Sequence, residues 1–203
     1  MMGKMLMVVF VGVIGVSFSA CSDLPRVLVL HDPLTPEEHV TLGLAYEVEG
    51  RPELAAREYD GALGKEHGYM PALIGLGNLA FDRGALEEAE AYYRQALIMA
   101  PEDPGVNNNL AMVYLTQQEK LDEAERLANL ALAQSGPLRP YVLDTIAHIY
   151  VRQGRYREAQ TALTNAEALA PPYDGVLHQR LTQLQQELAT SHPHMEQGLE
   201  VEH

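Results

Sequence analysis

The sequence of 203 residues has no tryptophan, three phenylalanines and a single cysteine, Cys21. With one thiol the chain cannot form an internal disulfide, and no cluster of cysteines is available to hold zinc. Aromatic residues make up 6% of the chain, and the abundance of alanine and leucine favours helices. Once an N-terminal targeting segment is set aside, the remaining length suits a single domain.

Basic residues are scarce as well. The chain has 14 lysines and arginines against 28 aspartates and glutamates, a formal net charge of −14 at pH 7. Binding to DNA or RNA relies on cationic side chains that displace counterions from phosphates, and the sequence offers no basic patch for this purpose. We therefore expect no nucleic-acid partner. The acidity either solubilises the surface or attracts a basic partner.

Motifs that carry catalysis are absent from the sequence. It contains no G-x-S-x-G, no P-loop, no H-E-x-x-H and no glycine-rich dinucleotide motif. The eight histidines are scattered, and His192 and His194 offer at best an adventitious metal contact. We expect no enzymatic activity, no cofactor, no metal site and no small-molecule substrate.

The chain begins with an apolar segment. Lys4 supplies a positive charge, and the run from Met5 to Phe18 is almost wholly apolar. This pattern is typical of a signal peptide over residues 1–20, because the run is shorter than the roughly 20 residues of a membrane-spanning helix. The residues Phe18-Ser19-Ala20-Cys21 resemble the lipobox of bacterial lipoproteins, in which the cysteine is acylated and becomes the mature N-terminus.

This resemblance implies that Cys21 carries the lipid, including palmitate. Ser22 directly after the cysteine implies sorting to the outer membrane, with the protein facing the periplasm; the alternative is a soluble periplasmic product. Residues 21–35 would then form the lipidated N-terminus and a tether. Within the tether, the apolar residues Val27 to Leu30 pack either on the folded part or on a partner.

From Pro36 onward the sequence repeats itself. An apolar residue followed by a small one recurs at Leu42-Gly43, Leu76-Gly77, Leu110-Ala111 and Ile146-Ala147. Two columns of alanine follow in each copy: Ala55, Ala89, Ala124 and Ala159, then Ala62, Ala96, Ala131 and Ala166. Residues that recur at this regular spacing indicate pairs of amphipathic helices, which must stack to bury their apolar faces. Glycines 50, 84 and 154 stand where the first helix of a pair must end.

These columns, together with recurring tyrosines and the phrase GALEEAEAYYRQALIMAPEDP, resemble the tetratricopeptide repeat (TPR) family. The resemblance covers Pro36 to Tyr173. It implies an all-α fold, a right-handed superhelical α-solenoid of four TPR helix pairs plus a C-terminal capping helix. We expect repeat units over residues 36–173, a capping helix over 174–190 and a disordered tail over 191–203. The units themselves are expected at about 36–69, 70–103, 104–138 and 140–173.

Local signals refine this scheme. Thr35 is expected to cap the first helix and Asp174 the last, whose leucines lie on one face. In the third unit the turn at residues 117–120 is longer and has no glycine, and a further residue is inserted near Gly136. We therefore predict a looser junction between units three and four.

Repeat arrays of this family use the inner face of each first helix as a concave groove for a partner segment. The matching positions here are Asn78, Phe81, Asp82, Asn108, Asn109, Met112, Leu115, Thr116, Asp144, Thr145, His148, Val151 and Arg152. Asparagine amides suit a peptide backbone, and Phe81 and Met112 offer apolar contact. Asp82 and Asp144 favour a cationic side chain. The basic members of the family's carboxylate clamp are missing, which argues against binding of that kind.

The resemblance implies a non-catalytic scaffold or adaptor at the outer membrane, similar to TPR lipoproteins that assist envelope, pilus or secretion assembly. Its partner would be a protein or peptide. An alternative comes from residues 31–50, HDPLTPEEHVTLGLAYEVEG, which are similar to the start of repeat regions attached to exported cysteine-peptidase-like proteins. On that interpretation the chain is an accessory subunit that recruits substrate to such an enzyme.

Overall fold

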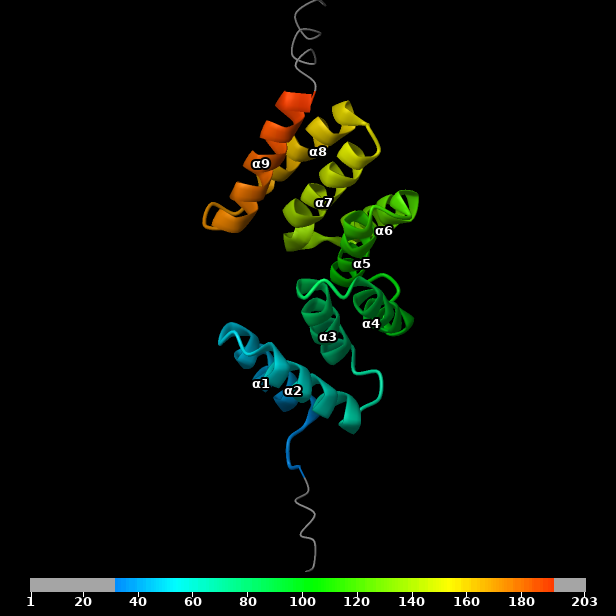
Figure 1. Cartoon of the computed structure of the whole chain (residues 1–203), viewed down its shortest axis with the longest axis vertical. Coiled ribbons are helices and arrows are strands. Elements are labelled where there is room, and N and C mark those ends of the chain that lie inside the picture. Colours follow the sequence, from blue (N-terminus) through cyan, green and yellow to red (C-terminus); the bar gives the residue numbers. More distant parts are fainter. Residues whose placement is uncertain (1–31, 192–203) are drawn as a thin grey trace, which may run out of the picture. The chain divides into compact units, whose positions relative to one another are not determined.

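The computed structural model describes residues 32–191. The predicted signal peptide, Cys21, the apolar part of the predicted tether and residues 192–203 lie outside this range, so the expectations about them stay predictions. Within it, the chain is helical and has no strand (Figure 1). The elements are α1 (Pro36–Val48), α2 (Pro52–Lys65), α3 (Met70–Asp82), α4 (Leu86–Met99), α5 (Pro104–Gln117), α6 (Leu121–Gln134), the 3-10 turn η1 (Gly136–Leu138), α7 (Arg139–Arg152), α8 (Tyr156–Leu169) and α9 (Gly175–Ser191).

Capping residues explain where several helices begin. At α1, the Glu38 amide donates to Thr35 Oγ1 at 3.2 Å and the Thr35 amide donates to Glu38 Oε2 at 2.8 Å, which completes a capping box. At α9, the Leu177 amide donates to Asp174 Oδ1 at 2.9 Å. Both predicted caps are therefore confirmed. α1, α2 and α5 each begin with a proline, whose missing N–H is not needed at this position.

The turns within the helix pairs depend on left-handed residues. Gly50, Gly84 and Gly154 have φ angles of 69°, 77° and 75°, which confirms the role predicted for them. The third pair has no glycine at this turn, and there Gln118 and Lys120 adopt φ angles of 55° and 48°. A side chain in this region costs about 1–2 kcal/mol, so the turn between α5 and α6 is the strained one.

The helices pack in chain order. α1 packs on α2, α3 on α4, α5 on α6 and α7 on α8, and each pair then contacts the next through α2–α3, α4–α5 and α6–α7. α9 closes the series against α7 and α8. The described chain is thus an all-α solenoid of four helix pairs with one further helix, as the repeat pattern predicted.

Small residues allow the close approach of the helices. All eight alanines of the two repeat columns are fully buried. The ring of Tyr59 lies between Gly43 of α1 and Gly75 of α3, and a Cβ atom on either glycine would come within 2.5 Å of the ring. The ring of Tyr93 meets Gly77 in the same way, also at 2.5 Å. Tyr59 and Tyr93 therefore require glycine opposite their rings.

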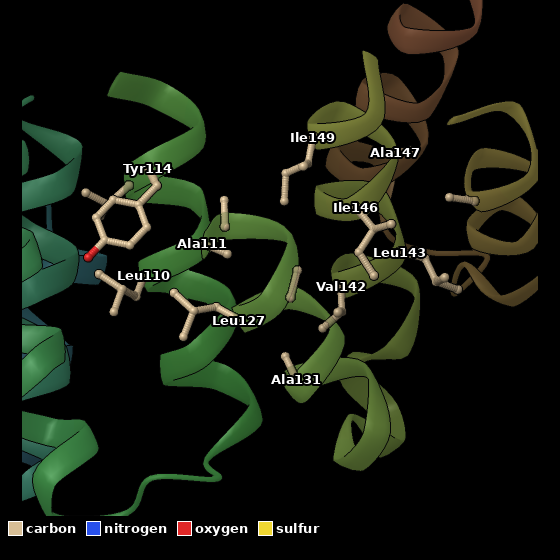
Figure 2. Packing of buried hydrophobic residues seen from close by; sticks show 14 of the residues in the cluster. Leu110, Ala111, Tyr114, Leu127, Ala131, Val142, Leu143, Ile146, Ala147 and Ile149 are labelled. Carbon is tan, nitrogen blue, oxygen red and sulfur yellow. The ribbon is translucent and has the colours of Figure 1, made fainter. Parts of the chain in front are cut away.

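The junction between the third and fourth pairs is packed without a break. Ala131 of α6 and Val142 of α7 are fully buried in one apolar cluster that extends from α3 to α9 (Figure 2). The extra residue near Gly136 is accommodated in η1, where the Leu138 amide donates to the Ser135 carbonyl at 2.7 Å. The structure therefore gives no packing reason for the looser junction that we expected.

The last helix has the predicted amphipathic form. Leu177, Leu181, Leu184 and Leu188 are at most 2% exposed, and the glutamines at 179, 183 and 186 face solvent. No helix within residues 32–191 is both long enough and apolar enough to cross a bilayer.

Candidate peptide-binding groove

Two adjoining depressions follow the first helices of the pairs. The first has a volume of about 310 Å³ and is lined by Glu47 of α1, by Asn78, Phe81 and Asp82 of α3, by Tyr93 of α4, and by Asn109 and Met112 of α5. The second, of about 420 Å³, is lined by Met112, Leu115, Thr116, Gln118, His148, Arg152, Arg180, Gln183 and Glu187. Because Met112 lines both, we treat them together as the groove.

Most of the predicted groove residues line these depressions. Asn78, Phe81, Asp82, Asn109 and Met112 line the first, and Met112 meets Leu115, Thr116, His148 and Arg152 in the second. Four predicted residues line neither. Asn108, Asp144 and Thr145 are buried at 9%, 0% and 1% exposure, and Val151 is half-buried against the apolar cluster.

A hydrogen-bonded pair of asparagines lies in the first depression. Tyr93 Oη donates to Asn78 Oδ1 at 2.8 Å, and Asn109 Nδ2 donates to the same oxygen at 3.1 Å. These bonds use the acceptor of Asn78 and a donor of Asn109, and leave the Asn78 Nδ2 group and the Asn109 Oδ1 atom for other partners. A donor and an acceptor on neighbouring side chains match the two polar groups of a peptide unit.

The hydroxyl of Tyr93 is held in its protonated form. Burial, and secondarily the negative charge of Asp82, raise the pKa of Tyr93 well above its ordinary value. The hydroxyl therefore stays a hydrogen-bond donor to Asn78 at any pH at which the protein works.

Asp144 has a structural partner in place of a ligand. Arg180 of α9 forms an ion pair with Asp144 Oδ2, and His148 Nε2 lies 3.5 Å from Asp144 Oδ1. Burial raises the pKa of Asp144 to about 6, although Arg180 acts in the opposite direction. The expected role of Asp144 in binding a guest cation is therefore wrong: its carboxylate is buried and already neutralised by the capping helix.

Arg180 also acts on His148, together with Arg152. Burial, then Arg180 and Arg152, lower the pKa of His148 to about 4, so its imidazole is neutral at pH 7. A neutral imidazole at the edge of the second depression can donate or accept one hydrogen bond. Among residues 32–191, no three side chains of histidine, cysteine, aspartate or glutamate converge on a possible metal position.

Sequence reasoning missed six lining residues: Glu47, Tyr93, Gln118, Arg180, Gln183 and Glu187. The signal for Glu47 was present, since it stands 34 positions before Phe81 in the column that continues to Leu115. Gln183 was expected to face water, which it does from the wall of the groove. Arg180 and Glu187 lie on α9, outside the repeats, where no column could indicate their direction.

A solenoid of stacked helix pairs with a groove of amide, apolar and charged side chains defines a protein-interaction scaffold of the helical-repeat class. Comparison with protein families specifies the class further. A tetratricopeptide repeat model matches residues 40–104 and 74–140, and a second tetratricopeptide repeat model matches residues 141–173. The chain belongs to the tetratricopeptide repeat family. No curated protein gave a significant match in sequence.

Solved structures share the fold at low sequence identity. A chain of the APC/C hetero-tetramer Cut9–Hcn1 is 20% identical with a TM-score of 0.64, over 74% of this chain and 30% of that one. PilW, a widely conserved type IV pilus biogenesis factor, is 19% identical with a TM-score of 0.64, over 68% and 63%. PilF of Pseudomonas aeruginosa is 20% identical with a TM-score of 0.61, over 80% and 78%. The chain thus spans less than two thirds of the length of the Cut9–Hcn1 chain and of PilW. At these sequence identities, the similarities show the fold alone.

Proposed function

We propose that this protein is a non-catalytic scaffold that binds an extended segment of a partner protein in the groove. The observation that carries the proposal is the pair Asn78 and Asn109, which presents a free amide donor and acceptor beside the apolar side chains of Phe81 and Met112. An extended segment needs backbone hydrogen bonds along its length and apolar contacts between them. The first depression offers both.

The proposed place of action is the periplasmic face of the outer membrane. Its support is the lipobox-like sequence that ends in Cys21, the single thiol of the chain. The several fatty chains of a bacterial lipoprotein hold a protein durably, whereas one chain holds it only marginally. A Cys21→Ser variant should leave the membrane fraction and incorporate no labelled palmitate. If the variant still sediments with outer membranes, the lipid anchor is wrong.

The process served is proposed to be envelope, pilus or secretion assembly. The likeness in fold to PilW and PilF supports this choice, together with the proposed location. The partner would then be a periplasmic segment of such an assembly.

Groove binding can be tested by site-specific photocrosslinking in intact cells. A photoreactive phenylalanine analogue at Met112 lies where the two depressions meet, and the same analogue at Glu167 of α8 lines neither of them and serves as control. We expect a crosslinked partner from position 112 and none from position 167. Substitution of both Asn78 and Asn109 by alanine should reduce the crosslink. Equal capture from both positions would place the binding site outside the groove.

A further inference from the structure

The first depression carries charge of one sign. Its lining includes two carboxylates, Glu47 and Asp82, and no lysine, arginine or histidine. A neighbouring depression of about 590 Å³ shares both carboxylates and adds Glu53 and Arg83. Arg83 is already paired with Glu88 of α4, so it does not neutralise the others.

Among residues 32–191, neither carboxylate has a cationic partner of its own. Within the described part of the chain, the side chain of Asp82 is exposed and makes no hydrogen bond or ion pair. Glu47 accepts a hydrogen bond from the hydroxyl of Tyr59, which is a neutral donor. Their negative charges act on the neighbouring tyrosines. Glu47 contributes to the raised pKa of Tyr59, and Asp82 contributes to the raised pKa of Tyr93.

The second depression has a different charge pattern. Arg152 and Arg180 line it together with one carboxylate, Glu187, which lies 4.0 Å from Arg152. Negative charge without compensation is therefore confined to the end of the groove formed by α1, α3 and α5. An acidic surface spread evenly over the protein would not produce this difference.

The walls beside the carboxylates suit the stem of a long cationic side chain. Lysine and arginine place three or four methylene groups along apolar surface and keep the charged group at a polar edge. Phe81 and Met112 provide that surface, and an aromatic face also attracts a cation directly. Asn78 and Asn109 lie in the same depression, where they can hold the backbone from which the side chain extends.

We propose that the first depression is a specificity subsite for a lysine or arginine side chain of the bound segment, whose charged group lies between Glu47 and Asp82. The inference rests on the proposed function, because it assumes that an extended segment occupies the groove. It adds the chemistry of that segment: one basic side chain, placed at the end of the groove nearest α1.

The test is selection of random 12-residue peptides displayed on phage against the full chain, purified in detergent. Three proteins are compared: the wild type, the double variant Glu47→Gln/Asp82→Asn, and the control Glu167→Gln. The control removes an exposed carboxylate of α8 that lines neither depression, and the amide oxygen introduced by Glu47→Gln still offers an acceptor to Tyr59. We expect lysine and arginine to be enriched about threefold over the input library with the wild type and the control, and not with the double variant.

The possible outcomes separate the two proposals. Peptides that are selected without enrichment in lysine or arginine, or with the same enrichment on the double variant, overturn the basic subsite and leave groove binding in place. Enrichment that is lost equally in Glu167→Gln also overturns the subsite, because the enrichment then reports general attraction to an acidic protein. If the wild type selects no peptides at all, both the groove and its subsite are wrong.

Discussion

The hydroxyl of Tyr93 donates a hydrogen bond of 2.8 Å to Asn78 Oδ1 and thereby connects the core of the second repeat to the floor of the groove. The ring of Tyr93 is buried against Gly77, which neighbours Asn78 in the sequence. A residue that looks purely structural in the repeat pattern therefore also fixes the direction of Asn78, a side chain that we propose binds the partner.

Replacing Tyr93 by phenylalanine should affect both stability and binding. The change removes the donor to Asn78 while keeping the ring, and a hydrogen bond of this kind contributes about 1 kcal/mol. We expect that loss in urea unfolding and a weaker crosslink from position 112. Tyr92→Phe is the matched control, since the Tyr92 hydroxyl has no hydrogen bond in the described part of the chain. Equal effects of the two substitutions would contradict the assignment.

A methyl group at Gly75 should be strongly unfavourable. The new Cβ would come within 2.5 Å of one edge of the Tyr59 ring, whose opposite edge already lies against Gly43, so the ring has little room to move away. Overpacking of this kind costs about 1–3 kcal/mol. Gly64→Ala serves as control, because nothing lies within 4 Å of that position in α2, and alanine there should be neutral or stabilising by up to about 1 kcal/mol. Thermal unfolding of the two variants measures these effects. A Gly75→Ala variant as stable as Gly64→Ala would contradict the prediction.

Asp144 and His148 should make the stability of the folded chain depend on pH in opposite directions. The pKa of Asp144 in the folded chain, about 6, lies above its ordinary 3.8, so its contribution to stability is present in acid and is lost as pH rises towards 6. The pKa of His148, about 4, lies below 6.5, so its contribution is present above pH 6.5 and is lost as pH falls towards 4. In the wild type, the changes in these two contributions to stability nearly cancel between pH 4 and 6.

Single substitutions should expose each contribution. On acidification from pH 6.5 to 4, the wild type should lose stability relative to His148→Asn, by on the order of 1–3 kcal/mol. Relative to Asp144→Asn it should instead gain stability over the same range. Urea unfolding at four or five pH values measures both differences. Parallel curves for all three proteins would show that neither group has a shifted pKa.

Hydrogen exchange should be faster in α1 than in α6 and α7. α1 buries only His39 and Gly43 of its own residues, whereas α7 buries eight and belongs to the cluster that extends from α3 to α9. Local opening is easiest where few apolar contacts must be broken. Exchange measured by mass spectrometry tests this order. Faster exchange at the junction of α6 and α7 would restore the looser junction that the sequence suggested.

Periodicity explains why the fold could be predicted. The alanine columns identify the contact surfaces, the glycines at 50, 84 and 154 mark the turns, and Thr35 and Asp174 mark helix starts through local hydrogen bonds. Each of these signals depends on residues close in sequence or one period apart. The left-handed turn at Gln118 and Lys120 shows that the fold persists where the local preference is absent.

The candidate site was harder to predict, because the direction of each side chain decides whether the residue lines the groove. Asn108 and Asn109 are neighbours, yet the rotation of about 100° between successive helical residues buries the first and places the second in the groove. Asp144 occupies a groove column, but Arg180 from α9 covers it. That contact joins residues from a repeat and a non-repeat helix, so no spacing in the sequence could indicate it.

The glycines that face tyrosine rings have a consequence for how the repeats relate to one another. Gly43 and Gly77 stand in the repeats whose second helices carry Tyr59 and Tyr93, whereas Ala111 and Ala147 stand in the repeats that carry Ala128 and Leu163 instead. In each repeat, the size of the side chain on the first helix is thus matched to the size of the side chain that faces it on the second helix. The four units are not interchangeable modules: a first helix transplanted from the third unit into the first would bring a methyl group onto Tyr59.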